Sequence, residues 1–139
     1  MQGVSTGFSR ADLRELTAAA VARRFMRLSV LFAMIGIGMG IYMGVSEDHA
    51  LRPVHVHVNL LGWVSCALYA LVYRAVPRMA DDALAGWHLV FAASGMVAMV
   101  CTFPLHLYGY EGVAPIVPAA FLASAAGMAL FAVLVFKHF

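Results

Sequence analysis

Charged residues are scarce in this chain of 139 residues, because Lys and Arg number 9, Asp and Glu number 7, and together they make up only 12% of the sequence. Soluble domains carry about a quarter. Hydrophobic residues reach 63%, so an ordinary soluble domain is excluded. The net charge is only +2, and no basic patch is interleaved with aromatic residues, which argues against nucleic-acid binding.

The few charges divide the chain into four long uncharged runs. These runs lie between Arg27 and Glu47, Arg52 and Arg74, Asp82 and Glu111, and Glu111 and Lys137. Each holds roughly 20 residues or more, the length that a helix needs to cross ~30 Å of hydrocarbon. The sequence therefore predicts an all-α integral membrane bundle of four transmembrane helices, at about residues 28–46, 53–75, 83–106 and 113–136, as one domain after the lead-in 1–27.

Basic residues lie mostly on one side of these spans. Only Arg52 lies on the other side; the rest are Arg10, Arg14, Arg23, Arg24, Arg27, Arg74, Arg78 and Lys137. Because Lys and Arg favour the cytoplasmic side, we expect a multi-pass protein of the bacterial inner membrane with both termini cytoplasmic. No small-residue cleavage pattern follows Gly44, so the first span is predicted to be an anchor rather than a removed signal peptide.

The lead-in has the pattern of a helix. Ser9 followed by Asp12 is a capping pattern, and Leu13, Leu16 and Val21 form an apolar stripe beside arginines. We expect residues 9–25 to form a separate amphipathic helix on the inner membrane surface. The alternative is a solvated basic lead-in.

Cysteine is also rare, with Cys66 in the second span and Cys101 near the outer end of the third. Their depths differ by very roughly 10 Å, too far for a disulfide, and both are expected to be small buried packing residues. Gly36, Gly40 and Gly44 recur every four residues in the first span. Such a stripe favours close helix packing, with room for a flat cofactor as the alternative.

Two histidines, His55 and His57, lie at membrane depth in the second span. Ionisable side chains there are costly and point by default to function. On a wheel of ~100° per residue, His55 shares a polar and small-residue stripe with Asn59, Gly62, Cys66, Tyr69 and Tyr73. His57 points the opposite way, with Leu60, Leu61, Val64, Leu68 and Leu71. Such a pair is not arranged to chelate one ion, and we expect it to serve two sites or two subunits.

Imidazole ligates haem iron, copper and zinc. Zinc needs three or four converging ligands, whereas haem needs one axial ligand on each side and apolar surroundings, as His57 has. We therefore predict non-covalent haem, since no covalent attachment motif is present. The alternative is a pair of histidines hydrogen-bonded to backbone or to Asn59 inside the bundle.

The other histidines are weaker candidates. His49 in the outer loop is expected to be solvated or to be a copper ligand, and His106, level with His55 and His57, is either a ligand or an interface residue. His88 beside Trp87 indicates an interfacial pair with a snorkelling ring, and His138 is expected to be solvated. Met43 and Met99 are candidate thioether ligands, and the fourth span is expected to be scaffold.

The stretch from His55 through Asn59 to Gly62-Trp63, with the tail Ala67 to Pro77, resembles the large subunit of haem-copper oxidases and nitric oxide reductases, most of all the C-type oxidases. The resemblance continues weakly through Trp87 to Gly95. It implies haem b, with the two histidines of the His-x-His helix ligating different haems. That subunit has about twelve spans in three pseudo-equivalent arcs of four. The resemblance therefore implies a homo-oligomer of this four-span chain, preferably a trimer, with His57 of one protomer and His55 of the next on opposite faces of one haem.

Three functions follow as expectations. The leading one is a haem b protein that acts in electron transfer or binds a diatomic gas (O2 or NO), with His55, His57, Asn59 and His106 at the cofactor. The second is a non-catalytic assembly or interaction partner of a respiratory complex. The third is membrane copper binding through His49, His55, His106 and methionines. The sequence leaves open whether any reaction is catalysed and which redox partner is used.

Overall fold

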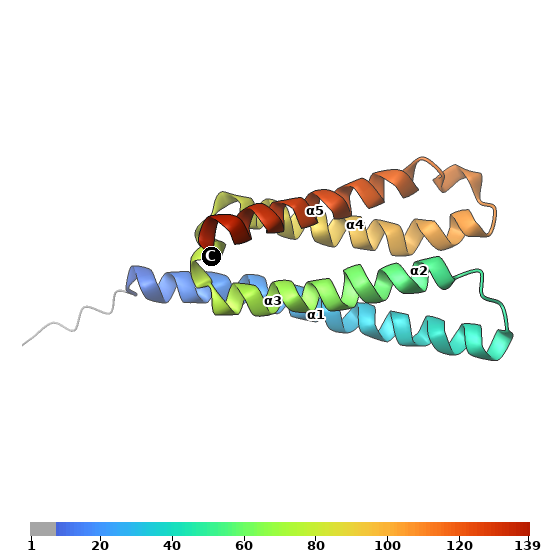
Figure 1. Cartoon of the computed structure of the whole chain (residues 1–139), viewed down its shortest axis with the longest axis horizontal. Coiled ribbons are helices and arrows are strands. Elements are labelled where there is room, and N and C mark those ends of the chain that lie inside the picture. The colour runs from blue at the N-terminus through green and yellow to red at the C-terminus, as the bar shows by residue number, and fades with distance from the viewer. Residues whose placement is uncertain (1–7) are drawn as a thin grey trace, which may run out of the picture.

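A computed structural model describes residues 8–139, and this part of the chain folds as helices joined by short connections. Four long helical segments run side by side (Figure 1). The elements are α1 (Arg10–Ser46), α2 (Arg52–His57), a π-helix η1 (Val58–Ser65), α3 (Cys66–Ala75), a 3-10 turn η2 (Pro77–Asp81), α4 (Ala83–Leu107), a 3-10 turn η3 (Glu111–Val113) and α5 (Ile116–His138).

The segments pair as two helical hairpins. The first hairpin joins α1 to the continuous rod made of α2, η1 and α3, and the second hairpin joins α4 to α5. In Figure 1 the hairpins meet at the end where η2 connects them and where the described chain begins and ends. They diverge toward the opposite end, which carries the loops 47–51 and 108–115.

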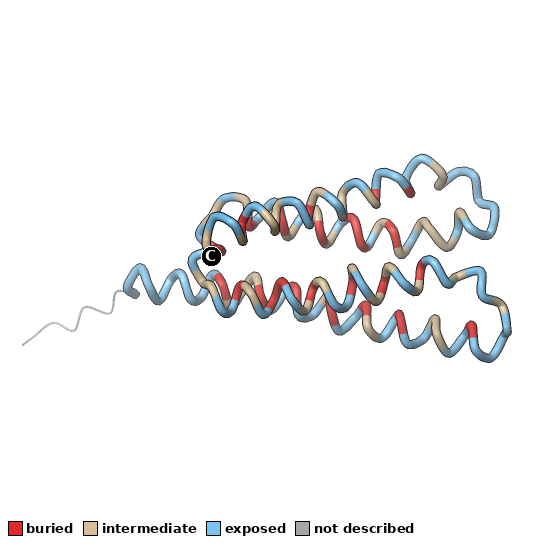
Figure 2. The backbone as a smooth tube through the Cα atoms, viewed as in Figure 1, coloured by how far each residue is buried: buried red, intermediate tan, exposed pale blue. Residues whose placement is uncertain are grey.

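Four helical segments are long and apolar enough to cross a membrane: Arg10–Ser46, Arg52–Ala75, Ala83–Leu107 and Glu111–His138. In Figure 2 the buried positions line the faces that the helices turn toward one another. Large apolar side chains cover the outside instead, with Leu68 53% and Leu122 71% exposed. Such a surface suits lipid rather than water, as the composition predicts.

The predicted separate N-terminal helix is not seen, because α1 runs unbroken over 37 residues, about 55 Å at ~1.5 Å per residue. The predicted cap is confirmed: the Ser9 hydroxyl accepts from the Asp12 amide at 3.1 Å, and the Asp12 carboxylate accepts from the Ser9 amide at 2.9 Å. The helix continues because no Gly or Pro interrupts it before Gly36 and because Ala18 and Ala22 join a buried cluster with Met79 of η2. Residues 10–25 are therefore the first turns of α1.

Side chains of the second span pack against two of the three glycines in the α1 stripe, Gly36 and Gly40, which favours the packing interpretation. A Cβ atom at Gly36 would lie 2.7 Å from the Asn59 amide, and one at Gly40 would lie 3.3 Å from Cε1 of His55. Gly44 faces open space. The stripe therefore lets the polar side chains of the second span approach the backbone of α1.

The two cysteines are free and differ in environment. Cys66 is buried, as predicted, but Cys101 is exposed on the outside of α4, so the expectation of a buried packing residue is wrong there. The reason is its face: Met99 of the same helix is fully buried in the core, and a residue two positions later points about 200° away around the helix.

Candidate functional site

The second span is not a regular helix around its histidines. After α2 the chain forms the eight-residue π-helix η1, and α3 then resumes the α-helix. Side chains bond the loosened carbonyls: the Ser65 hydroxyl donates to Leu60 at 2.9 Å, and the Ser29 hydroxyl donates to Trp63 at 2.9 Å. The π-turn is frequent at functional sites. A helical wheel with a constant step per residue does not reveal the π-helix. Its one indication in the sequence is the hydroxyl of Ser65, five residues after Leu60, which is the hydrogen-bond spacing of a π-turn.

His55 faces α1. Its ring edge lies over Gly40, and the Asn59 amide donates to the His55 carbonyl at 2.8 Å while lying 3.4 Å from the ring Nδ1. The ring is half-buried. His55 and Asn59 therefore form one polar unit set into the glycine stripe of α1.

His57 faces the second hairpin. Its ring meets Phe121 of α5 edge-on at a centroid distance of 5.0 Å and Phe103 of α4 at 6.2 Å. The Nδ1 atom lies 2.7 Å from the Pro53 carbonyl. A carbonyl only accepts hydrogen bonds, so Nδ1 carries a proton, and in the neutral ring Nε2 then has the free lone pair. The two rings contact different helices, in agreement with the opposed faces predicted, whereas their roles as haem ligands stay predictions.

His106 and His49 do not join the pair in a cluster. His106 lies on α4 one turn beyond Phe103, with its Nδ1 atom buried and without a hydrogen-bond partner in residues 8–139. His49 is exposed, and its Nδ1 lies 2.9 Å from the Glu47 carbonyl. Across the described residues, no group of three or more His, Cys, Asp and Glu side chains is placed to hold a metal ion. Met43 and Met99 are buried, and Met99 joins a core cluster with Phe32, Val54 and Val58; their roles as thioether ligands stay predictions.

His88 lies in a different environment from the interfacial one predicted. It does not snorkel beside Trp87 but is fully buried, while Trp87 is 59% exposed. The Tyr73 hydroxyl lies 3.0 Å from the His88 Nδ1 atom, and Phe25 packs on the ring at a centroid distance of 4.8 Å. A partial signal was present, because Tyr73 lies on the polar stripe of the second span, at the end nearest in sequence to His88.

An ionic cluster closes the end of the bundle where the hairpins meet. Asp82 caps α4 by accepting from the Leu84 amide at 3.0 Å, and its carboxylate also accepts from Lys137 at 2.6 Å and lies 3.2 Å from the His138 Nε2. The Lys137 hydrogen bond, then the Leu84 amide and then His138 hold the pKa of Asp82 well below its usual range. The expectation that His138 is solvated is wrong, because Asp82 and Arg78 both bond it.

No family model, curated protein or solved structure matches this chain. The resemblance to the haem-copper oxidases therefore stays a prediction from the motif His55 to Trp63. The structure brings His55 and Asn59 together and directs His57 to the other side, with His106 one helical turn from a phenylalanine that His57 contacts.

Proposed function

We propose that this protein binds haem b non-covalently in a membrane and acts in electron transfer or in binding a diatomic gas. The observation that carries the proposal is the hydrogen bond between the His57 Nδ1 atom and the Pro53 carbonyl, 2.7 Å long. In metal-ligating histidines, a hydrogen bond from the other ring nitrogen to a carbonyl fixes the tautomer and the orientation of the ring. It leaves the His57 Nε2 atom as a prepared axial ligand.

The surroundings of His57 fit a porphyrin. Phe103 and Phe121 present aromatic edges and faces beside the ring, and Val56 and Leu60 on the same turn are exposed apolar side chains. A haem when bound supplies the redox-active iron. The residues of this chain would hold its edge in apolar contact, exclude water and keep the ligating nitrogen unprotonated.

His55 would supply the ligand for the other face from a second copy of the chain. Within one protomer the two rings point toward different helices, so they do not face a common plane. Both residues are half-buried rather than enclosed. A homotrimer would bring together twelve spans and three copies of the π-helical segment, with a haem at each seam.

The orientation in the membrane follows from charge. Eight of the nine basic residues lie before the first span, between the second and third, or after the fourth, and the structure places these three regions at one end of the bundle. We infer a bacterial inner membrane location with this end in the cytoplasm. The haem ligands would then lie toward the outer half.

The test is an absorption spectrum of detergent-purified protein, oxidised and then reduced, after expression with ample haem. We expect a Soret band and, on reduction, sharp α and β bands that are lost or shifted in His57→Ala and in His55→Ala. His49→Ala is the matched control, since this exposed loop histidine bonds only its own turn, and it is expected to keep the wild-type spectrum. Carbon monoxide binding to the reduced protein would indicate an open iron position and gas binding; its absence would favour electron transfer.

Two outcomes would overturn the proposal. A colourless protein, with variants that lose only thermal stability, would make both hydrogen-bonded histidines structural and favour an assembly or interaction partner of a respiratory complex. Stoichiometric copper in the purified protein, reduced by His49→Ala or His106→Ala, would favour the copper-binding alternative.

A further inference from the structure

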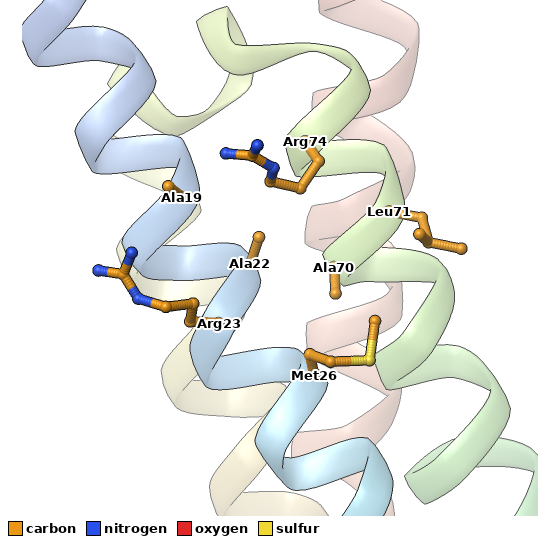
Figure 3. A pocket seen from close by; sticks show the side chains of 7 residues that line it. All are labelled: Ala19, Ala22, Arg23, Met26, Ala70, Leu71 and Arg74. Carbon is orange, nitrogen blue, oxygen red and sulfur yellow. The ribbon is translucent and has the colours of Figure 1, made fainter.

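A groove opens on the side of the bundle between α1 and α3, near the end that carries both termini. It has a volume of about 340 Å³, within the range of small-ligand sites. Its floor is made by the buried residues Ala22 and Ala70, and Met26 lies on its wall. In Figure 3 the Arg74 side chain extends from α3 toward α1, whereas the Arg23 side chain leaves α1 on the side turned away from α3. The groove is thus apolar at its base and cationic at its rim.

The two arginines lack an acidic partner among residues 8–139, in contrast to Arg14 and Lys137 at this end. Arg14 pairs with Asp81 and Lys137 pairs with Asp82. Arg23 and Arg74 are exposed and make no ion pair within the described part of the chain. Two guanidinium groups without an acidic partner, one on each edge of the groove, create a positive potential that favours an anion.

The groove also lies at the depth of lipid headgroups. Arg23 precedes Arg27, the residue before the first predicted span, by one helical turn, about 6 Å, and Arg74 is the residue before the last one of α3. Met26 and Leu71 continue the groove toward the hydrocarbon. The depth assigned to the groove rests on the membrane orientation proposed above and is independent of the haem site.

From charge, shape and depth together, we propose that this groove binds one anionic phospholipid. Guanidinium groups match phosphate oxygens in a planar fork, so Arg23 and Arg74 would hold the headgroup phosphate. An acyl chain would lie along Met26 and Leu71. Basic pockets between transmembrane helices on the cytoplasmic side suit such headgroups, and a zwitterionic lipid would gain less because its own cation opposes the arginines.

Native mass spectrometry of the full chain in detergent, titrated with phosphatidylglycerol or phosphatidylcholine, tests the proposal. We expect one phosphatidylglycerol to bind more tightly than phosphatidylcholine. Each of Arg23→Gln and Arg74→Gln should weaken it about 5-fold, and the double variant about 30-fold, as expected for ~1 kcal/mol per basic residue near an anionic headgroup. The control is the double variant Arg10→Gln with Arg52→Gln, which removes the same charge. Arg10 begins α1, about 20 Å before Arg23 at helical rise, and Arg52 begins α2 at the far end of the second span, so screening should keep the change in affinity below 2-fold.

A further variant separates a shaped site from plain charge attraction. Ala19→Leu narrows the groove, which Ala19 lines, and keeps both arginines, so it should weaken phosphatidylglycerol binding without changing the net charge. Circular dichroism on each variant shows that the helices are retained. Equal binding of both lipids, equal loss in the Arg10 and Arg52 control, or equally tight binding of free glycerol phosphate would each overturn the proposal.

Discussion

The two hairpins use their glycines differently. In the second hairpin, Gly95 and Gly127 bring backbone against backbone: a Cβ at Gly95 would lie 2.5 Å from the Ser124 amide, and one at Gly127 would lie 2.8 Å from the Ala92 amide. In the first hairpin, Gly36 and Gly40 receive side chains of the second span instead. The second hairpin is therefore built as a rigid scaffold, whereas the first leaves room for ionisable groups and a π-turn.

The buried His88 links the two hairpins, and its loss should have the largest effect on stability. His88→Ala removes a fully buried ring packed between Phe25 of α1 and Phe131 of α5 and leaves the Tyr73 hydroxyl unpaired. We expect a loss of about 3 kcal/mol, measured by thermal unfolding in detergent with circular dichroism.

Tyr73→Phe separates the contribution of the Tyr73–His88 hydrogen bond from that of the packing around the His88 ring. It keeps the ring and removes only the hydroxyl that lies 3.0 Å from the His88 Nδ1, so the loss should be about 1 kcal/mol. Tyr69→Phe is the matched control, because its hydroxyl donates to the weak acceptor Sδ of Met128 at 3.4 Å. If His88→Ala costs no more than His57→Ala, His88 does not join the hairpins as described.

The scaffold role of the second hairpin is tested on α4 itself. Gly95→Ala must push α5 away, because the new methyl group meets backbone, and a loss of about 2 kcal/mol is expected. Gly86→Ala on the same helix meets nothing within 4 Å and should be neutral or stabilise by up to about 1 kcal/mol. Unfolding curves of the two variants side by side provide the measurement, and equal midpoints would contradict the close backbone contact.

The first hairpin should tolerate the same change better. At Gly36 the nearest atoms belong to the end of the Asn59 side chain, which can rotate away. In Gly36→Ala the displaced Asn59 side chain should lose its hydrogen bond to the His55 carbonyl, at a cost of about 1 kcal/mol of stability. The higher helix propensity of alanine should offset this cost. The net change in the free energy of unfolding should therefore lie within about 1 kcal/mol of the change in Gly44→Ala, in which the new methyl group meets open space. A cost as large as that of Gly95→Ala would remove the distinction between the hairpins.

Much of the architecture follows from sequence, and the exceptions have physical causes. The four helical segments, the Ser9 cap and the opposed directions of His55 and His57 follow from charge spacing and helical periodicity. The π-helix does not, because it depends on donors such as Ser29 that reach the second span from α1. The burial of His88 depends on Tyr73, fifteen residues away, and the continuity of α1 depends on η2. Each exception depends on contacts between different helices, which the periodicity within a single segment does not reveal.

The smallest expected effect concerns the ionic cluster where the hairpins meet. The pKa of Asp82 is lowered in the folded protein, chiefly by Lys137 and the Leu84 amide, so its contribution to stability is full above the unfolded value of about 4. It is lost progressively as the pH falls from there toward the folded pKa, because the unfolded state then binds more protons than the folded one. Thermal unfolding from pH 6 down to pH 3 should show the wild type losing stability faster than Asp82→Asn, whose side chain does not titrate. Parallel pH profiles would mean that the cap and ion pair on Asp82 do not hold the two hairpins together at this end, and that the buried contacts around His88 do so alone.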